Sequence, residues 1–209
     1  MSRPRVRIRF RKQGDLRWIS HRDLVRVFER LMRRAGLRLG MSEGFHPKAR
    51  MMFPSALALG VEGLDEIMEF ELAEPLEAEE IAGRLAEQAP AGLHLNEVRL
   101  MEPHERKARL RRVTYRMPVP SALHGLLETR LRQLEEQPSL WIQDQGDQPC
   151  NPSASGLDQL DFQQGTLQFR LWCNRQGGVS PRWVLQALGL DGPQWEGACL
   201  TRSEVEIEG

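Results

Sequence analysis

Cysteines and aromatic residues are scarce in this chain of 209 residues. Phe, Trp and Tyr make up 6% of it, and the three cysteines, Cys150, Cys173 and Cys199, are widely spaced. An odd number of distant cysteines does not indicate a disulfide framework, and it favours the reducing cytoplasm. Neither the cysteines nor the histidines have the spacing of a metal site, so we expect no metal and no cofactor.

Long apolar runs are also absent. No window approaches the roughly 18 apolar residues that cross a bilayer, and the charged opening Ser2–Arg7 lacks the apolar core of a secretory signal. We therefore expect a cytoplasmic globular protein without a membrane-spanning segment. The sequence has no glycine-rich phosphate-binding motif and no nucleophile elbow, which favours binding over catalysis.

The formal net charge of zero hides two oppositely charged blocks. Residues 1–60 hold 15 Lys and Arg against 4 Asp and Glu, whereas residues 61–105 hold 2 against 13. A basic face attracts a polyanion even on a neutral protein, which favours an RNA partner. Alternatively, the two blocks pair with each other when the chain folds.

Hydrophobic alternation and helix signals follow the same order twice along the chain. The predicted strands of the two halves are 5–10, 37–41, 66–72 and 93–100, then 113–119, 140–143, 166–173 and 200–207. The predicted helices are 20–35, 76–88, 121–137 and 181–188, and residues 144–156 form a loop. This order predicts an α+β fold of two tandem ferredoxin-like (βαββαβ) halves with antiparallel sheets, residues 1–105 and 106–209.

Two sets of arginines in the first half are candidate RNA-binding residues, because arginine suits bidentate contact with phosphate. The sets are Arg22, Arg26, Arg30 and Arg33 on one helix face, and Arg5, Arg7 and Arg9 along the first strand. A solvated helix face explains the first set equally well. For the second set, we expect Glu69 and Glu71 opposite Arg7 and Arg9, which would make the sheet a poor anion site.

Two segments of the second half add RNA-binding candidates. The run Arg106–Arg112 holds five cations and no acid, and it contributes Arg109, Arg111 and Arg112. Such runs contact nucleic acid or partners, although a solvated linker is commoner. Arg170 and Trp172 are expected to face away from the second core, where they offer a stacking platform for a base or an interface.

The loop Ser42–Lys48 is the most chemically suggestive segment. Its Gly44 permits close backbone approach, and His46 and Lys48 project from a turn stiffened by proline, so both are RNA-binding candidates. Together with His21, His46 could supply the acid and base for cleavage of an RNA phosphodiester. Structural roles, in a helix cap and in a braced turn, are the alternative for these two catalytic candidates.

Several of these segments resemble the opening of a bacterial family of unknown function. The resemblance lies in Phe10–Leu24, Val27–Arg30, Arg33–Leu37, Ser42–Lys48 and Ala58–Glu62. Members of that family occur as the C-terminal domain of, or as a separate partner to, cobalamin-binding-type radical S-adenosylmethionine proteins. This implies partnership with a radical enzyme and not radical chemistry here, because the Cys-x3-Cys-x2-Cys grouping of the cluster is missing. At the level of the fold alone, the tandem halves also resemble repeat-processing endoribonucleases of CRISPR systems.

The sequence therefore predicts a non-catalytic accessory protein that binds tRNA or rRNA, a radical S-adenosylmethionine enzyme, or both. Two alternatives remain at this point. One is a protein–protein adaptor that does not bind RNA, and the other is a metal-independent endoribonuclease.

Overall fold

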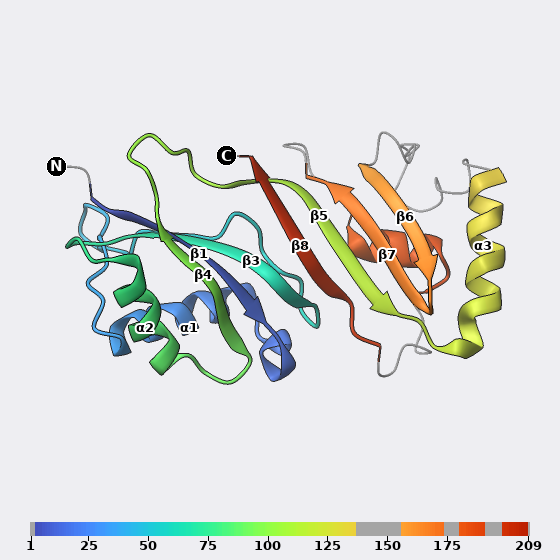
Figure 1. Cartoon of the computed structure of the whole chain (residues 1–209), viewed down its shortest axis with the longest axis horizontal. Coiled ribbons are helices and arrows are strands. Elements are labelled where there is room, and N and C mark those ends of the chain that lie inside the picture. Colours follow the sequence, from blue (N-terminus) through green and yellow to red (C-terminus); the bar gives the residue numbers. More distant parts are fainter. Residues whose placement is uncertain (1–2, 137–155, 174–179, 191–197, 209) are drawn as a thin grey trace. The chain divides into compact units, whose positions relative to one another are not determined.

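The computed structural model describes residues 3–136, 156–173, 180–190 and 198–208, so the predicted strand 140–143 and most of the predicted loop 144–156 lie outside it. The described residues form an α+β protein with eight strands and four α-helices (Figure 1). None of these helices is long and apolar enough to cross a membrane. The chain divides into two compact units, unit 1 (residues 1–110 and 207–209) and unit 2 (residues 111–206).

Unit 1 has the element order βαββαβ. Its elements are β1 (Arg5–Lys12), α1 (His21–Arg34), β2 (Met51–Met52), β3 (Glu62–Glu71), α2 (Ala78–Gln88) and β4 (Leu93–Leu100), with a 3-10 helix (Gly14–Trp18) before α1. The strands are antiparallel neighbours in the order β4-β1-β3-β2. The predicted strand 37–41 makes only isolated bridges, from Leu39 to Leu72 and from Met41 to Ala49.

The core of unit 1 explains why β1 and α1 form where the sequence predicts them. Val6, Ile8 and Phe10 alternate along β1 and are buried together with the apolar stripes of α1 and α2. The Oγ of Ser20 accepts a hydrogen bond from the N–H of Asp23 (3.2 Å), which confirms the predicted N-cap. Both helices thus cover one face of the sheet, and the alternate residues of β1 point to the other face.

The remaining elements belong mainly to unit 2. They are β5 (Arg109–Pro118), a 3-10 helix (Ser121–Leu123), α3 (His124–Glu136), β6 (Leu157–Gln163), β7 (Thr166–Trp172), α5 (Pro181–Ala187) and β8 (Thr201–Glu208). Their strand order is β8-β5-β7-β6. The stacked rings of Tyr115 and Phe169 (5.3 Å) lie in the core between β5 and β7. Ser180 caps α5, and Pro181 is its first residue, as predicted.

Strand β6 is an element that the sequence pattern did not predict. It pairs with β7 through a tight turn in which Gln164 and Gly165 both have positive φ (50° and 74°). Apart from β7, no described strand pairs with it, and none of its residues is fully buried. Hydrophobic alternation arises where one strand face is buried, so a half-exposed strand such as β6 carries little of that signal.

Candidate nucleic-acid interface

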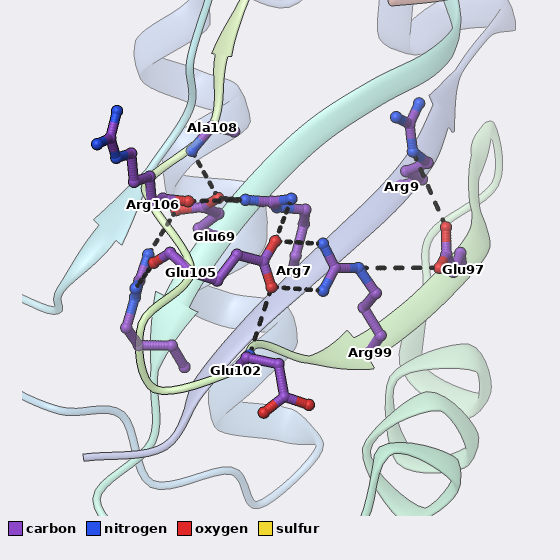
Figure 2. Close-up of polar contacts among 10 residues, drawn as sticks. Arg7, Arg9, Glu69, Glu97, Arg99, Glu102, Glu105, Arg106 and Ala108 are labelled. Carbon is purple, nitrogen blue, oxygen red and sulfur yellow. Dashed lines mark hydrogen bonds and ion pairs between the residues drawn. The ribbon is translucent and has the colours of Figure 1, made fainter. Parts of the chain in front are cut away.

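The arginines of β1 that point away from the core of unit 1 have acidic partners (Figure 2). Arg7 is only 3% exposed, and its guanidinium contacts Glu69 through Nε (2.9 Å) and a terminal nitrogen (2.7 Å). Arg9 pairs with Asp65 and lies 3.9 Å from Glu97. These predicted RNA-binding side chains are therefore already neutralised by the protein itself.

The register of β1 against β3 confirms one of the two expected ion pairs and corrects the other. Arg7 lies opposite Glu69, as expected. Arg9 lies opposite Ile67 and not opposite Glu71. The two strands are antiparallel, so two residues forward along β1 means two residues backward along β3, and Glu71 falls on the far side of Glu69.

Glu105, which follows β4, completes this cluster of charges. Its carboxylate contacts Arg7 (2.6 Å) and both terminal nitrogens of Arg99 (2.8 and 2.5 Å). The hydrogen bonds from Arg99, with the positive charge of Arg7, lower the pKa of Glu105 to about 2. The same hydrogen bonds with Glu105 raise the pKa of Arg99. Glu105 is therefore ionised throughout the neutral range.

The backbone after β4 is also fixed to the sheet. Arg5 donates to the carbonyl of Glu105 (2.6 Å), and Arg7 donates to the carbonyl of Arg106 (3.1 Å). The N–H of Ala108 donates to the carboxylate of Glu69, which also binds Arg7 (2.9 Å). A phosphate on this face would have to displace these internal partners, so the face is a poor anion site.

The arginine stripe of α1 is exposed to solvent. Arg26 pairs with Asp23 one turn before it (3.1 Å). The side chains of Arg22, Arg30 and Arg33 are exposed, and no acidic group among the described residues pairs with them. Unlike the arginines of β1, these three remain available to an anionic ligand.

The loop Ser42–Lys48 is closed at its base by its own hydrogen bonds. The N–H of Ser42 donates to the carbonyl of Lys48 (2.8 Å), and the N–H of Lys48 donates to the Oγ of Ser42 (2.9 Å). Gly44 has φ 122°, which L side chains rarely adopt and which explains the glycine. Phe45 is fully exposed, and His46 beside it is exposed too.

A groove of about 640 Å³ lies between the C-terminal end of α1 and the end of this loop. Its charged lining residues are Arg33, Arg38, Lys48 and Glu29, and its apolar ones are Leu37, Leu39, Met41, Pro47 and Ala49, with Gly36 between. We call it the basic groove. It joins two candidates from separate parts of the sequence, Arg33 of the helix stripe and Lys48 of the loop.

The charges around the basic groove favour an anion. Of its cations, Arg38 is engaged by Glu74 (2.7 Å), while no described acidic residue pairs with Arg33 or Lys48. The C-terminal end of a helix carries a partial negative charge that disfavours anions. Arg33 and Arg34 in the last turn of α1 offset it. The exposed arginines farther up α1 extend the positive surface.

A smaller cleft of about 300 Å³ lies against β2 and β3, with a floor that includes Met51, Met52 and Phe70. Around it stand Arg5, Arg50, Lys107, Glu69 and Glu71. Arg50 is bound to Glu71 (3.3 Å) and Arg5 contacts Glu69 (3.5 Å), so Lys107 is the one cation of this cleft with no acidic partner among the described residues, against two in the basic groove. The basic groove is the better candidate for a polyanion.

The candidates of unit 2 form a cluster of their own. The guanidinium of Arg112 lies over the Trp172 ring, 3.8 Å from its centroid, and Arg111 lies 5.5 Å from it. Asp158 binds Arg170 (2.7 Å) and approaches Arg112 (3.7 Å). The predicted stacking platform is thus half-buried and already occupied by an arginine of the same unit. Arg109, which belongs to unit 1, is exposed at the start of β5.

The two candidate histidines lie near opposite ends of α1, His21 at its first residue and His46 in the loop Ser42–Lys48 beside its C-terminal end. His21 is the first residue of α1, and its ring packs edge-on against Phe53 with Nδ1 buried and unpaired. The residues after His46 line the basic groove beside Arg33. Because a helix rises about 1.5 Å per residue, His21 and Arg33 are roughly 18 Å apart along the axis. This placement argues against a shared acid–base site.

Sequence reasoning did not identify three features of this surface. It did not assign roles to Glu105 and Arg99, whose contact with Arg7 depends on tertiary structure. It also gave no role to Phe45, although an aromatic residue between Gly44 and His46 in a polar loop indicates an exposed contact residue.

Among the described residues, no group of three or more His, Cys, Asp or Glu side chains could hold a metal ion.

The fold and the surface define an α+β protein with a basic groove at one end of its first helix. The chain matches, over residues 5–180, the family described as uncharacterized protein conserved in bacteria (DUF2344), and it belongs to that family. This confirms the resemblance to a bacterial family of unknown function. A comparison with curated proteins found no match.

Proposed function

We propose that this protein is a non-catalytic accessory protein that binds RNA through the basic groove. The observation that carries the proposal is the meeting of Arg33 and Lys48 in one groove, with neither side chain engaged by an acidic residue in the described parts of the chain. Arg30 and Arg22 continue the positive surface along α1. A row of cations of this kind follows a phosphate backbone.

A radical S-adenosylmethionine enzyme is the proposed protein partner. The support is the resemblance of the first segments of the chain to proteins that accompany such enzymes. In this proposal the protein presents RNA and the partner performs the chemistry.

We also infer that each unit is a ferredoxin-like half. The support is the element order βαββαβ together with the neighbour order β4-β1-β3-β2 in unit 1 and β8-β5-β7-β6 in unit 2. In both, the first and third strands are central and the second and fourth lie outside. Such domains often bind RNA on the sheet face, but the ion pairs of Arg7 and Arg9 leave the helix end as the better site here.

A salt series tests RNA binding. Fluorescein-labelled tRNA fragments are titrated with the full chain while anisotropy is followed from low to near-physiological salt. Binding should weaken steeply, and in Arg33→Gln/Lys48→Gln the slope of log affinity against log salt should be shallower by roughly 0.7–0.9 per lost phosphate contact. Arg116→Gln, an exposed arginine of β5 bonded to Gln168, is the matched control. Absence of binding at low salt, or an equal loss in the control, overturns the proposal.

A protein–protein adaptor is the second candidate, and a specific surface supports it. Trp18 is 59% exposed and Leu59 is 56% exposed, and the turn that follows Leu59 packs on the indole. Arg17 stacks on the same ring at 4.9 Å. Exposed tryptophan beside arginine is the composition of interface anchors. Co-purification with the radical enzyme that survives nuclease treatment and is lost in Trp18→Ala would favour this candidate.

A further inference from the structure

We propose that the basic groove takes an unpaired, single-stranded segment of RNA, with Phe45 stacked on one of its bases. This inference rests on the RNA binding proposed above, and it specifies the kind of RNA. It concerns one continuous surface, formed by the end of α1, the segment that follows it and the loop Ser42–Lys48.

The lining of the basic groove is the first argument. Beside its cations the groove exposes Leu39, Met41 and Pro47, and the Met41 residue is 42% exposed. An RNA duplex presents phosphates, 2′-hydroxyls and the polar edges of its bases, while the apolar faces of the bases are stacked inside the helix. An apolar wall has few apolar partners on such a surface. A single strand offers unstacked bases to that wall while its phosphates face Arg33 and Lys48.

The exposure of Phe45 is the second argument. No other large hydrophobic residue among the described ones is as exposed, and the hydrogen bonds between Ser42 and Lys48 hold the loop that carries it. Proteins that bind single strands combine a positive groove with aromatic side chains on which bases stack. Phe45 precedes Pro47 by two residues, so their Cα atoms are at most about 7 Å apart. The Cα of Phe45 therefore lies close to the wall of the basic groove, and its side chain is within reach of a base bound there.

The charge pattern is consistent with one short strand. Arg33 and Lys48 come from different segments that line the groove, the end of α1 and the loop Ser42–Lys48, and each can hold one phosphate of a strand bound there. The cations of α1 lie in a line that starts at Arg33, so a longer strand has further contacts in one direction. A protein segment that uses Phe45 as its docking point is the competing occupant.

The test compares single-stranded and duplex RNA on the same protein. A labelled RNA of about 12 nucleotides, alone and annealed to its complement, is titrated with the full chain, Phe45→Ala, Phe45→Trp and Leu126→Ala. Leu126 of α3 is the matched control for truncation, since it is exposed (55%) and does not line the groove. Circular dichroism melting curves check that each variant is folded.

We expect the wild type to bind the single strand roughly tenfold or more tightly than the duplex. Phe45→Ala should lose about tenfold on the single strand, within the roughly 5- to 150-fold that one base stack is worth, and Phe45→Trp should retain or gain affinity. The salt slope should not change in either, because phenylalanine carries no charge. Leu126→Ala should bind like the wild type.

The outcomes separate this inference from the proposed function. Equal affinity for both RNAs, with Phe45→Ala unchanged, would leave RNA binding intact and overturn the single-strand inference. No binding of either RNA would overturn both. A loss in Leu126→Ala as large as that in Phe45→Ala would show that Phe45 has no specific role and would overturn the inference.

Discussion

Arg7 of β1 and Arg99 of β4 lie directly opposite each other in neighbouring antiparallel strands. Like charges in that position repel each other, and Arg7 is almost fully buried. The carboxylate of Glu105 contacts both guanidiniums, at 2.6 Å from Arg7 and 2.5 Å from Arg99 (Figure 2). Glu105, in the segment after β4, thus supplies the negative charge that offsets the repulsion between these two arginines.

Replacing Glu105 should therefore destabilise the protein. Glu105→Gln keeps the shape of the side chain but removes its charge, and it leaves a buried guanidinium facing another one. We expect the free energy of unfolding, measured in urea, to fall by about 2–4 kcal/mol. Glu102→Gln is the control, since its exposed side chain lies three residues earlier. Equal losses in the two variants would contradict this role of Glu105.

The same carboxylate should make stability depend on acid. Its pKa is about 2 in the folded protein, below the ordinary 4.5, so the unfolded chain takes up this proton first as the pH falls. The contribution of Glu105 is complete above about pH 5 and is lost as the pH falls towards 2. The difference in melting temperature between wild type and Glu105→Gln should be largest near neutrality and should shrink over that range. A difference that stays constant from neutrality to about pH 2.5 would argue against it.

Elements with one buried face could be predicted from the sequence. Val6, Ile8 and Phe10 alternate along β1, Leu24 and Phe28 lie on one face of α1, and all five belong to one core. Burial in that core requires the strand period of two and the helix period of 3.6. Strand β4 begins and ends where the pattern places it. Strand β6 could not be predicted because little of it is buried. The second strand of the first half, β2, has only the residues Met51 and Met52, too few to show an alternating pattern.

The candidate site was predictable only in pieces. The exposed stripe on α1 follows from helical spacing, and the expected pair of Arg7 with Glu69 follows from strand neighbours. The meeting of Arg33 with Lys48 does not follow from either, because it depends on how residues 37–49 fold back along the end of α1. Register direction also had to be observed, since it decides whether Ile67 or Glu71 faces Arg9.

The reactivity of Cys173 provides a test of unit 2. Burial raises the pKa of this thiol, although the positive charge of Arg202 acts in the opposite direction. The thiolate is the reactive form, so iodoacetamide near pH 8 should alkylate Cys173 more slowly in the folded protein than in urea. Mass spectrometry of the peptide that contains Cys173 measures both rates. Equal rates in the two states would show that the thiol is not shielded.

Two glycines nine residues apart should respond to alanine in opposite directions. Gly92 has φ +83°, and a Cβ there would lie 2.4 Å from the backbone oxygen of Gln13, whose N–H donates to the Gly92 carbonyl (2.9 Å). Gly83 lies inside α2, and nothing stands within 4 Å of the position of its Cβ. Gly92→Ala therefore combines a left-handed backbone with a clash, whereas Gly83→Ala improves helix propensity in open space.

We expect Gly92→Ala to lower the free energy of unfolding by about 2 kcal/mol or more. Gly83→Ala should raise it by roughly 0.5–1 kcal/mol. Urea denaturation of the full chain measures both, and similar slopes of the transitions would show that the unfolded states are comparable. Because Gly83 lies within α2 and Gly92 lies in the turn that follows this helix, a general weakness of this region would move both variants in the same direction. Opposite signs are expected only if the backbone at Gly92 has the left-handed conformation and the contact with Gln13 that the structure describes.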